Sequence, residues 1–414
     1  MDNKKTAPIA PLFETIDSCN FTSLENILTK SPGYNQSGEP NMLGANSDAQ
    51  AINTFLRDYR TAKLTYRSYL KEIERLLLWC LHGQKVGLSD LKRDHIIAYR
   101  EFLSDPQPKE VWCGPRKPRT LPCGTPNPQW RPFAAPLSPP SVRKTLSILD
   151  SFFSYLVQNN YFAGNPMAVD KRRKGKKSNS TDRWLERDEI ITTLEALDEL
   201  AHNLYEWKFE VIRAKYIILT LFYTGLRLAE LTHHTMGDFI LIEDAWYLKV
   251  IGKGEKERKI PVVDEYLDVV AQFRRALGLS PLPQFGEKTP LVPALETEEA
   301  LSDSRVWQIL KWAFSKGANR YEYLDAKHNE EKQKNFHKAS KLRKASTHWL
   351  RHSYGTYLVR AGCPIEKVKE LMGHSDISTT MIYVHIAKSD LHTSANNLSL
   401  HKDLENDVEE DEDN

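Results

Sequence analysis

The sequence has few of the features that mark a secreted, zinc-binding or membrane protein. Its five cysteines are odd in number and form no C-x-x-C pair, which argues against a zinc knuckle and against a disulfide framework. There is no run of about 18 apolar residues, the length that a membrane helix needs. The N-terminal sequence M-D-N-K-K-T-A-P also lacks the apolar core of a signal peptide. We therefore expect a soluble, cytoplasmic protein that has no membrane partner.

The chain also lacks the common motifs of nucleotide-dependent and metal-dependent phosphate chemistry. Its glycine-rich segment G-K-G-E-K-E does not have the G-x-x-x-x-G-K-[ST] spacing of a P-loop, and no H-E-x-x-H is present. No group of carboxylates shows convincing metal-binding spacing either. We expect an activity that requires no cofactor and no metal.

The charge is distributed unevenly along the 414 residues. The overall value of +2 combines −7 from residues 402–414 and −3 from the first 48, so that residues 49–401 carry +12. A folded region this basic favours a polyanionic partner, although a charged surface also serves solubility alone.

Length and composition predict two principal domains with distinct ends. We expect a flexible N-terminal segment (1–48), a helical domain (49–168), a basic linker (169–182), a second domain (183–398) and an acidic tail (399–414). Apolar residues at helical spacing predict the helices of the first domain, at Ala51–Tyr59, Thr65–His82, Arg93–Leu103 and Val142–Gln158.

The second domain alternates between helical and strand-like patterns. Three short segments rich in β-branched and aromatic residues predict a small antiparallel sheet, at Asp238–Glu243, Trp246–Ile251 and Lys259–Val263. Helical patterns occur at Tyr216–Tyr223, Val306–Phe314, Thr347–Arg360, Ile365–Leu371 and Thr379–His385. The expected fold is mainly α with a small antiparallel β-sheet.

Three segments interrupt this regular pattern. Residues 105–140 contain 11 of the 22 prolines and are predicted to be a loop, whose basic and aromatic residues either follow a nucleic-acid backbone or pack on the domain. Residues 321–344 are expected to be a charged insertion. The linker has a run of six positive charges that would gain from phosphate contacts through counterion release; we take these as candidate DNA-binding residues, namely Lys171, Arg172, Arg173, Lys174, Lys176 and Lys177.

Several residues of the second domain have the chemistry that cleavage of a phosphodiester without a metal requires. Arginine neutralises the non-bridging oxygens with a planar fork that keeps its proton, and Arg227 and Arg351 are the candidates. Tyr383 is the candidate nucleophile, because a tyrosine leaves a stable phosphate ester. Lys253, in a predicted hairpin turn, would protonate the leaving oxygen, with Lys256 as the alternative.

Each of these residues also has an ordinary structural interpretation. Arg227 would serve equally to bind carbonyl groups at a helix end, and Lys253 to occupy a hairpin tip. His348 and Arg351 would form a surface pair on one helix face, and Tyr383 would be a core residue. Their occurrence together, in one order along the chain, favours the catalytic interpretation.

Five sequence boxes carry a resemblance to a known family. T-G-L-R-L-A-E-L, V-I-G-K-G-E-K-E-R-K-I-P-V, H-W-L-R-H-S, L-M-G-H-S and S-T-T-M-I-Y resemble the boxes of the tyrosine recombinases, or phage integrases, in the family's order. The resemblance implies a helical, SAM-like DNA-binding domain followed by a mixed α/β catalytic domain. It also implies that Glu230 supports the active-site arginines, that Tyr383 is the nucleophile, and that the scissile phosphate is surrounded by Arg227, Lys253, His348, Arg351 and His374.

The resemblance further implies a site-specific recombinase that joins DNA strands through a 3′-phosphotyrosyl intermediate. Its partners would be double-stranded DNA recombination sites and three further copies of the chain, in a tetramer that exchanges strands through a Holliday junction. The two insertions and the long N-terminal segment favour a mobile-element integrase. Resolution of chromosome or plasmid dimers, a type IB topoisomerase and a catalytically idle DNA-binding regulator are the alternatives.

Overall fold

The chain folds into two compact units, residues 1–177 and 178–414. The computed structural model describes residues 9–13, 33–38, 40–168, 183–204, 208–252, 254–294, 297, 299–324 and 328–387. The predicted basic linker and acidic tail lie outside these ranges. Within them, no helix combines the length and the apolar character that a bilayer crossing requires.

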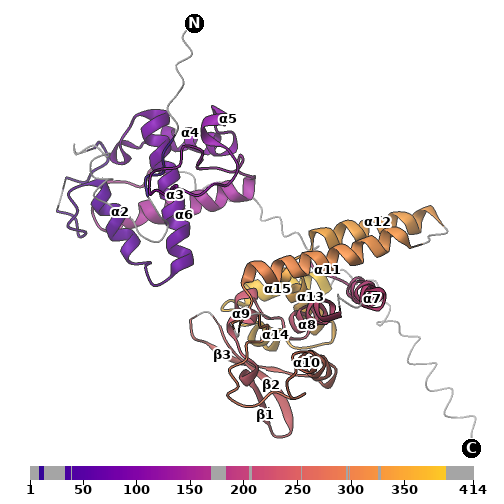
Figure 1. The fold of residues 1–414 in the computed structure, drawn as a ribbon. Coiled ribbons are helices and arrows are strands. Elements are labelled where there is room, and N and C mark those ends of the chain that lie inside the picture. The colour runs from indigo at the N-terminus through magenta and orange to yellow at the C-terminus, as the bar shows by residue number, and fades with distance from the viewer. Residues whose placement is uncertain are drawn as a thin grey trace, which may run out of the picture. The chain divides into compact units, whose positions relative to one another are not determined.

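The regular secondary structure described for the first unit consists of helices (Figure 1). Helices α3 and α6 are its longest elements, and α6 contacts α2, α3 and α4. Rings from three helices meet in the core, where Phe55 lies 4.9–5.1 Å from Tyr69, Phe152 and Tyr155 between ring centroids. The elements are α2 (Asp48–Arg57), α3 (Lys63–Trp79), the π-helical turn η1 (Cys80–Gln84), η2 (Leu88–Asp90), α4 (Arg93–Ser104), α5 (Lys109–Trp112) and α6 (Pro139–Gln158).

The described parts of the first 48 residues differ from the expected flexible segment. Ile9 and Phe13 are each 1% exposed within the core of the first unit. The backbone amide of Leu12 donates to the Glu74 carboxylate at 3.0 Å, and that of Asn35 donates to the Ser89 carbonyl at 2.8 Å. Isolated apolar residues show no periodicity in sequence, yet they are buried when tertiary contacts receive them.

The proline-rich segment packs on the domain, which decides between the two alternatives for its aromatic residues. Trp112 and Trp130 are both buried. Arg119 donates two hydrogen bonds of 2.6 Å to the Glu74 carboxylate and lies over the Trp130 ring at 5.1 Å. Arg116 and Lys117 are exposed. Apart from α5 and its last two residues, Pro139 and Pro140, which begin α6, the segment is thus a loop held by buried rings and a largely buried ion pair.

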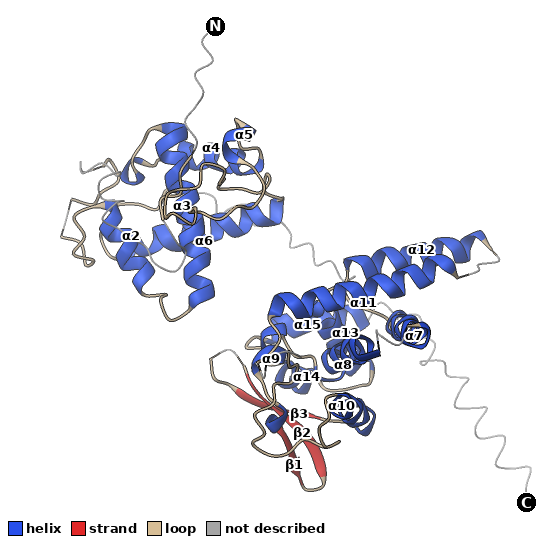
Figure 2. Cartoon of the chain, in the orientation of Figure 1, coloured by secondary structure: helices blue, strands red, loops and turns tan. Residues whose placement is uncertain are grey.

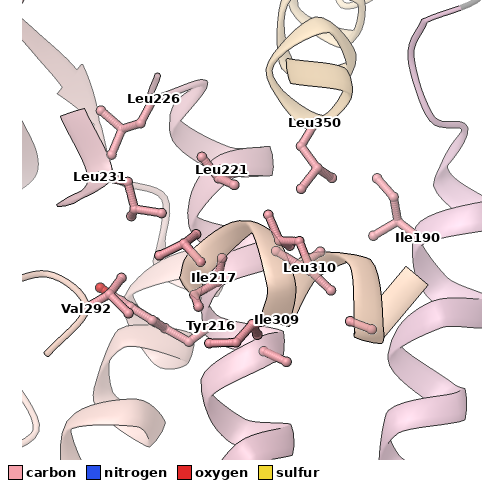
Figure 3. Packing of buried hydrophobic residues seen from close by; sticks show 14 of the residues in the cluster. Ile190, Tyr216, Ile217, Leu221, Leu226, Leu231, Val292, Ile309, Leu310 and Leu350 are labelled. Atoms are coloured by element: carbon pink, nitrogen blue, oxygen red, sulfur yellow. The ribbon is translucent and has the colours of Figure 1, made fainter. Parts of the chain in front are cut away.

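The second unit surrounds one apolar helix, α8 (Lys208–Thr224). This helix contacts α7, α10, α11 and α13, so it is buried on most of its circumference. Figure 3 shows Tyr216, Ile217 and Leu221 of α8 among apolar side chains of α7, α11 and α13. The other helices are α7 (Arg187–Asn203), α9 (Leu228–His233), η5 (Met236–Asp238), α10 (Asp264–Ala276), α11 (Asp303–Tyr323), α12 (Asn329–Lys344), α13 (Thr347–Arg360), α14 (Ile365–Met372) and α15 (Ile377–Ala387).

A three-stranded antiparallel sheet lies beside these helices in the order β1-β2-β3 (Figure 2). The strands are β1 (Phe239–Ile242), β2 (Ala245–Ile251) and β3 (Glu257–Pro261). Leu248 pairs with Ile260 and Val250 with Arg258, and all four side chains are buried. The structure thus confirms the predicted fold class, mainly α with a small antiparallel sheet.

Residues 321–344, expected to be a charged insertion, form the end of α11 and the whole of α12. The two helices pack against each other side by side (Figure 1). Ala339 and Leu342 are completely buried, and Lys341 donates to the Glu189 carboxylate of α7 at 2.8 Å. The apolar stripe of α12 consists of only two buried residues, Ala339 and Leu342. Two apolar residues among charged ones are too few to predict a helix from the sequence pattern.

Candidate active site

Arg227 begins helix α9, after a turn that requires glycine. Gly225 has φ +60°, and a Cβ there would lie 2.3 Å from the Tyr354 ring. Arg227 is the N-cap residue of α9; its backbone amide donates to Glu230 Oε2 at 2.8 Å and its Nη1 to Glu230 Oε1 at 2.8 Å. Its Nη2 donates to the Gly373 carbonyl, also at 2.8 Å. The guanidinium is therefore held between α9 and the end of α14.

Glu230 is a buried carboxylate that joins two arginines. Besides Arg227, it accepts from Arg258 of β3, with Nη1 at 3.1 Å from Oε1 and Nη2 at 2.7 Å from Oε2. Burial alone would raise the pKa of Glu230, but the hydrogen bonds and charges of Arg258 and Arg227 lower it to about 2. Glu230 therefore stays ionised, and it can hold both cations over a wide pH range.

Arg351 comes from α13 and is 2% exposed. It donates to the carbonyl oxygens of Gly225 and Met372, which precede Arg227 and His374. Burial, followed by the charge of Arg227, lowers the pKa of Arg351 to about 10. The side chain remains protonated at neutral pH, so the site contains two neighbouring cations, Arg227 and Arg351.

Three histidines lie close to these arginines. His348 and His352 are one turn apart on α13, with ring centroids separated by 4.9 Å. The Nδ1 of His374 lies 3.0 Å from the Thr380 hydroxyl, in hydrogen-bond contact with α15. Burial lowers the pKa of each of the three, and the Arg351 charge adds to this effect. Near neutral pH these imidazoles are therefore uncharged.

Tyr383 is carried by α15 and is 1% exposed. Its ring centroid lies 6.1 Å from that of His374, with nearly parallel planes, and 5.6 Å from that of His352. A Cβ at Gly355 of α13 would be 2.7 Å from the Tyr383 ring, so glycine at this position lets the ring lie against the helix. Burial raises the pKa of Tyr383 to about 12, against the opposing charges of Arg351 and Arg227.

Five of the six predicted catalytic residues thus meet in one place, namely Arg227, His348, Arg351, His374 and Tyr383. The sixth, Lys253, and the six basic linker residues lie outside the described residues. Next to position 253, the β2–β3 turn borders an open cleft of about 810 Å³. Lys256, the alternative proton donor, is exposed and lines this cleft together with Arg227 and His374.

Sequence reasoning missed three residues that are built into the site: His352, whose ring lies beside Tyr383, Arg258 and His234. Arg258 and His234 are both buried. The signal for Arg258 was its position on the same strand face as Ile260, since a charged residue on a buried face requires a partner. No comparable signal marked His234, which follows α9 in a polar sequence.

Comparison with known proteins supports the assignment of the chain to a family. The model of the phage integrase family matches residues 183–390. The tyrosine recombinase XerD of Staphylococcus aureus (strain N315) is 28% identical over 254 residues, which are 61% of this chain and 73% of that protein. XerD of Staphylococcus epidermidis has the same identity over 253 residues.

Solved structures show the same fold at lower identity. The XerH site-specific recombinase bound to difH substrate is 18% identical with a TM-score of 0.51, over 84% of each chain. The Tn1549 transposon integrase in complex with transposon right end DNA is 15% identical with a TM-score of 0.51, over 84% of this chain and 98% of that one. With half of its length matched by the family model, the chain belongs to the phage integrase family.

Proposed function

We propose that the protein is a site-specific DNA recombinase that cuts and rejoins strands through Tyr383. The observation that carries this proposal is the convergence of two arginines and three neutral imidazoles on one buried tyrosine, in a chain of the phage integrase family. The partners are duplex DNA recombination sites and further copies of the chain, four in the synaptic complex. Such a reaction takes place where the DNA is, and we place the protein in the cytoplasm.

The first step forms a bond between the Tyr383 hydroxyl oxygen and the scissile phosphorus. Arg227 and Arg351 bind the non-bridging oxygens and stabilise the charge that develops in the pentacoordinate transition state. The hydroxyl proton passes to a neutral imidazole, for which His348 and His374 are the candidates. The bond from phosphorus to the 5′ oxygen breaks, and Lys253 supplies the proton that this leaving oxygen takes up.

The product of that step is a 3′-phosphotyrosyl ester and a free 5′-hydroxyl. Because the ester replaces one phosphodiester bond by another, a second 5′-hydroxyl can reverse the reaction on a new strand with little change in free energy. Two rounds of this exchange, joined by a Holliday junction, recombine two DNA sites without a nucleotide cofactor.

A covalent-capture experiment tests this proposal and identifies the DNA site. Tagged protein is incubated with sheared DNA of its host, denatured with detergent, recovered, and the attached DNA is sequenced. We expect wild-type protein to enrich one or a few sites, and Tyr383→Phe to recover none, because the phenolic oxygen is the atom that bonds to phosphorus.

The matched control is Tyr357→Phe, the same change on α13 at a half-buried ring that contacts Trp184 and Phe222. This variant should recover the same sites as wild type. Adducts formed by Tyr383→Phe would disprove the role of Tyr383. Absence of adducts from wild-type protein would favour the idle DNA-binding regulator.

The biological role is a finer proposal, for which we favour integration or excision of a mobile element. Two plasmids that carry the captured site should yield recombinants, whereas a type IB topoisomerase would only relax them. Direct repeats flanking the captured site in the host DNA would support a mobile element. A single captured site in the chromosome, without repeats, would favour resolution of chromosome dimers instead.

A further inference from the structure

The β2–β3 hairpin is tied to α9 through the first buried residue of β3. Arg258 is 7% exposed and donates to both oxygens of Glu230, at 3.1 and 2.7 Å. Its Nε donates to the Leu371 carbonyl at the end of α14, at 3.0 Å. One guanidinium therefore joins the hairpin, α9 and the end of α14.

A second tie holds the last residue of β2 to the same helix. His234 is buried directly after α9, and its Nε2 accepts a hydrogen bond from the Ile251 backbone amide at 2.9 Å. Its Nδ1 lies 2.9 Å from the Glu230 carbonyl oxygen, which can only accept. The ring therefore accepts at Nε2 and donates from Nδ1. Arg258 and His234 hold the hairpin to α9 on both sides of the turn at 252–256.

Glu230 and Gly373 connect these ties to the candidate catalytic groups. The Glu230 carboxylate binds Arg227 as well as Arg258. The Gly373 carbonyl accepts from Arg227, while a Cβ at Gly373 would lie 3.0 Å from Arg258 Nη1. The turn that leads to His374 is thus packed directly on the Arg258 side chain.

We propose that Arg258 and His234 are positioning residues for strand cleavage: they hold the hairpin, α9 and the turn before His374 in one arrangement around the scissile phosphate. Neither residue touches the DNA in this role, which rests on the proposed function above. A displacement of about 1 Å in a catalytic group can lower a rate about 100-fold. Loss of the Arg258 guanidinium removes its bonds to Glu230 of α9 and to the Leu371 carbonyl at the end of α14 at once.

The test is single-turnover cleavage of a nicked duplex that carries the captured site, with protein in excess. Arg258→Met keeps the length of the side chain and removes its hydrogen bonds. We expect the cleavage rate at saturating protein to fall about 100-fold, with the DNA dissociation constant, measured in the Tyr383→Phe background, within about 3-fold of its value with Arg258 present. Arg258→Lys, which keeps the charge but lacks the planar fork, should be intermediate.

The chain provides a matched control in Arg274 of α10. This arginine is 1% exposed, donates to the Glu287 carboxylate at 3.0 Å and to the Ser280 carbonyl at 2.7 Å. Arg274→Met therefore removes an equally buried carboxylate-bound guanidinium away from the site. It should lower the melting temperature as Arg258→Met does, and leave the cleavage rate of the folded protein within about 3-fold of wild type.

The pH dependence separates positioning from a general loss of stability. Without Arg258, the pKa of Glu230 rises from its low value, because burial is no longer opposed by the nearest cation. Protonation of Glu230 then releases Arg227 at mildly acidic pH. The rate of Arg258→Met should therefore fall more steeply below pH 6 than the rate of wild type or of Arg274→Met.

Wild-type cleavage by folded Arg258→Met, or an equal loss of rate in Arg274→Met, would overturn the proposal. If Arg258→Met does not fold, His234→Asn carries the test, because asparagine reaches the Glu230 carbonyl but not the Ile251 amide. A loss of about 10-fold at saturating protein supports positioning, and a wild-type rate refutes it. Failure of wild-type protein to form the Tyr383 adduct would instead refute the proposed function.

Discussion

At Tyr383, burial and positive charge act on the same hydroxyl in opposite directions. Burial raises the pKa to about 12 even though Arg351 and Arg227 favour the phenolate. The free protein therefore keeps the proton on the hydroxyl at neutral pH. We infer that proton loss accompanies attack on the phosphate and does not precede it, so a nearby base contributes to the rate.

The histidines around Tyr383 provide the first prediction in solution. Burial, with the neighbouring charges, lowers the pKa values of His352 and His374 to about 4, from an ordinary value of 6.5. A nuclear magnetic resonance titration of the free protein should show both rings neutral at pH 6, with midpoints near 4. A midpoint near 6.5 for either ring would contradict the buried geometry.

The same shifts set the sign of the stability change in acid. Because the folded-state pKa values are depressed, the unfolded chain takes up protons first as the pH falls below 6.5, and folding becomes less favourable down to about pH 4. A fall of the pKa from 6.5 to about 4 would cost at most about 3.5 kcal/mol for each ring, since one pKa unit corresponds to about 1.4 kcal/mol. Replacement of His374 by Gln should remove part of this loss, measured by urea unfolding at pH 7 and pH 5.

At the scale of elements, the turn from α8 to α9 decides where Arg227 points. Gly225 combines φ +60° with direct contact to Tyr354, while Gly278 has φ +75° and no atom within 4 Å of the place that a Cβ would occupy. The two glycines therefore separate backbone strain from steric overlap, since both positions favour glycine but only one is crowded.

Alanine substitutions at these glycines give the second prediction. Gly278→Ala should cost about 1–2 kcal/mol of unfolding free energy, because a residue with a Cβ is strained in the left-handed conformation. Gly225→Ala should cost about 1–3 kcal/mol more, because the Tyr354 ring must also move. Urea unfolding of the two variants measures the difference. Equal losses of unfolding free energy in the two variants would mean that the Tyr354 ring moves aside at no energetic cost.

The predicted elements differ from the observed ones mainly where tertiary packing decides. Helix Thr347–Arg360 begins and ends at the predicted residues, with Ser346 directly before it and Gly362 shortly after it. Helix α12 was not predicted, since only Ala339 and Leu342 are buried on it and the rest of its sequence is charged. The first residues of β3 were missed for a similar reason, as Arg258 occupies a buried strand position.

At the scale of the whole molecule, charge is the property most directly coupled to the proposed DNA partner. Residues 49–401 carry +12, and the two ends of the chain are acidic. Binding to duplex DNA should therefore weaken steeply with salt, because each neutralised phosphate releases a counterion. The basic residues of the linker are six of the contacts we propose.

Replacement of those six residues by glutamine gives the third prediction. If all six contact phosphates, the slope of log affinity against log salt concentration should decrease in magnitude by about 5. Fluorescence anisotropy with the captured duplex, at several salt concentrations, measures this slope, and circular dichroism checks the fold. An unchanged slope would show that the linker does not contact phosphate.

The family, the fold class and the residue types of the candidate site can all be read from the amino-acid sequence. Local patterns carry this information: apolar periodicity identifies helices, and short boxes such as T-G-L-R and G-H-S place Arg227 and His374 in order along the chain. The chemistry of phosphodiester cleavage then selects arginine, tyrosine, histidine and lysine from among the residues of those boxes.

How these groups are held, and how they are charged, depends on the folded arrangement of the chain. The shared carboxylate of Glu230, the ties from Arg258 and His234, and the burial of Tyr383 all join residues that are remote in sequence. Their pKa values follow from this arrangement, because burial and neighbouring charges depend on the three-dimensional positions of the residues. A sequence pattern records which side chains are present, whereas their interaction energies depend on distances that only folding creates.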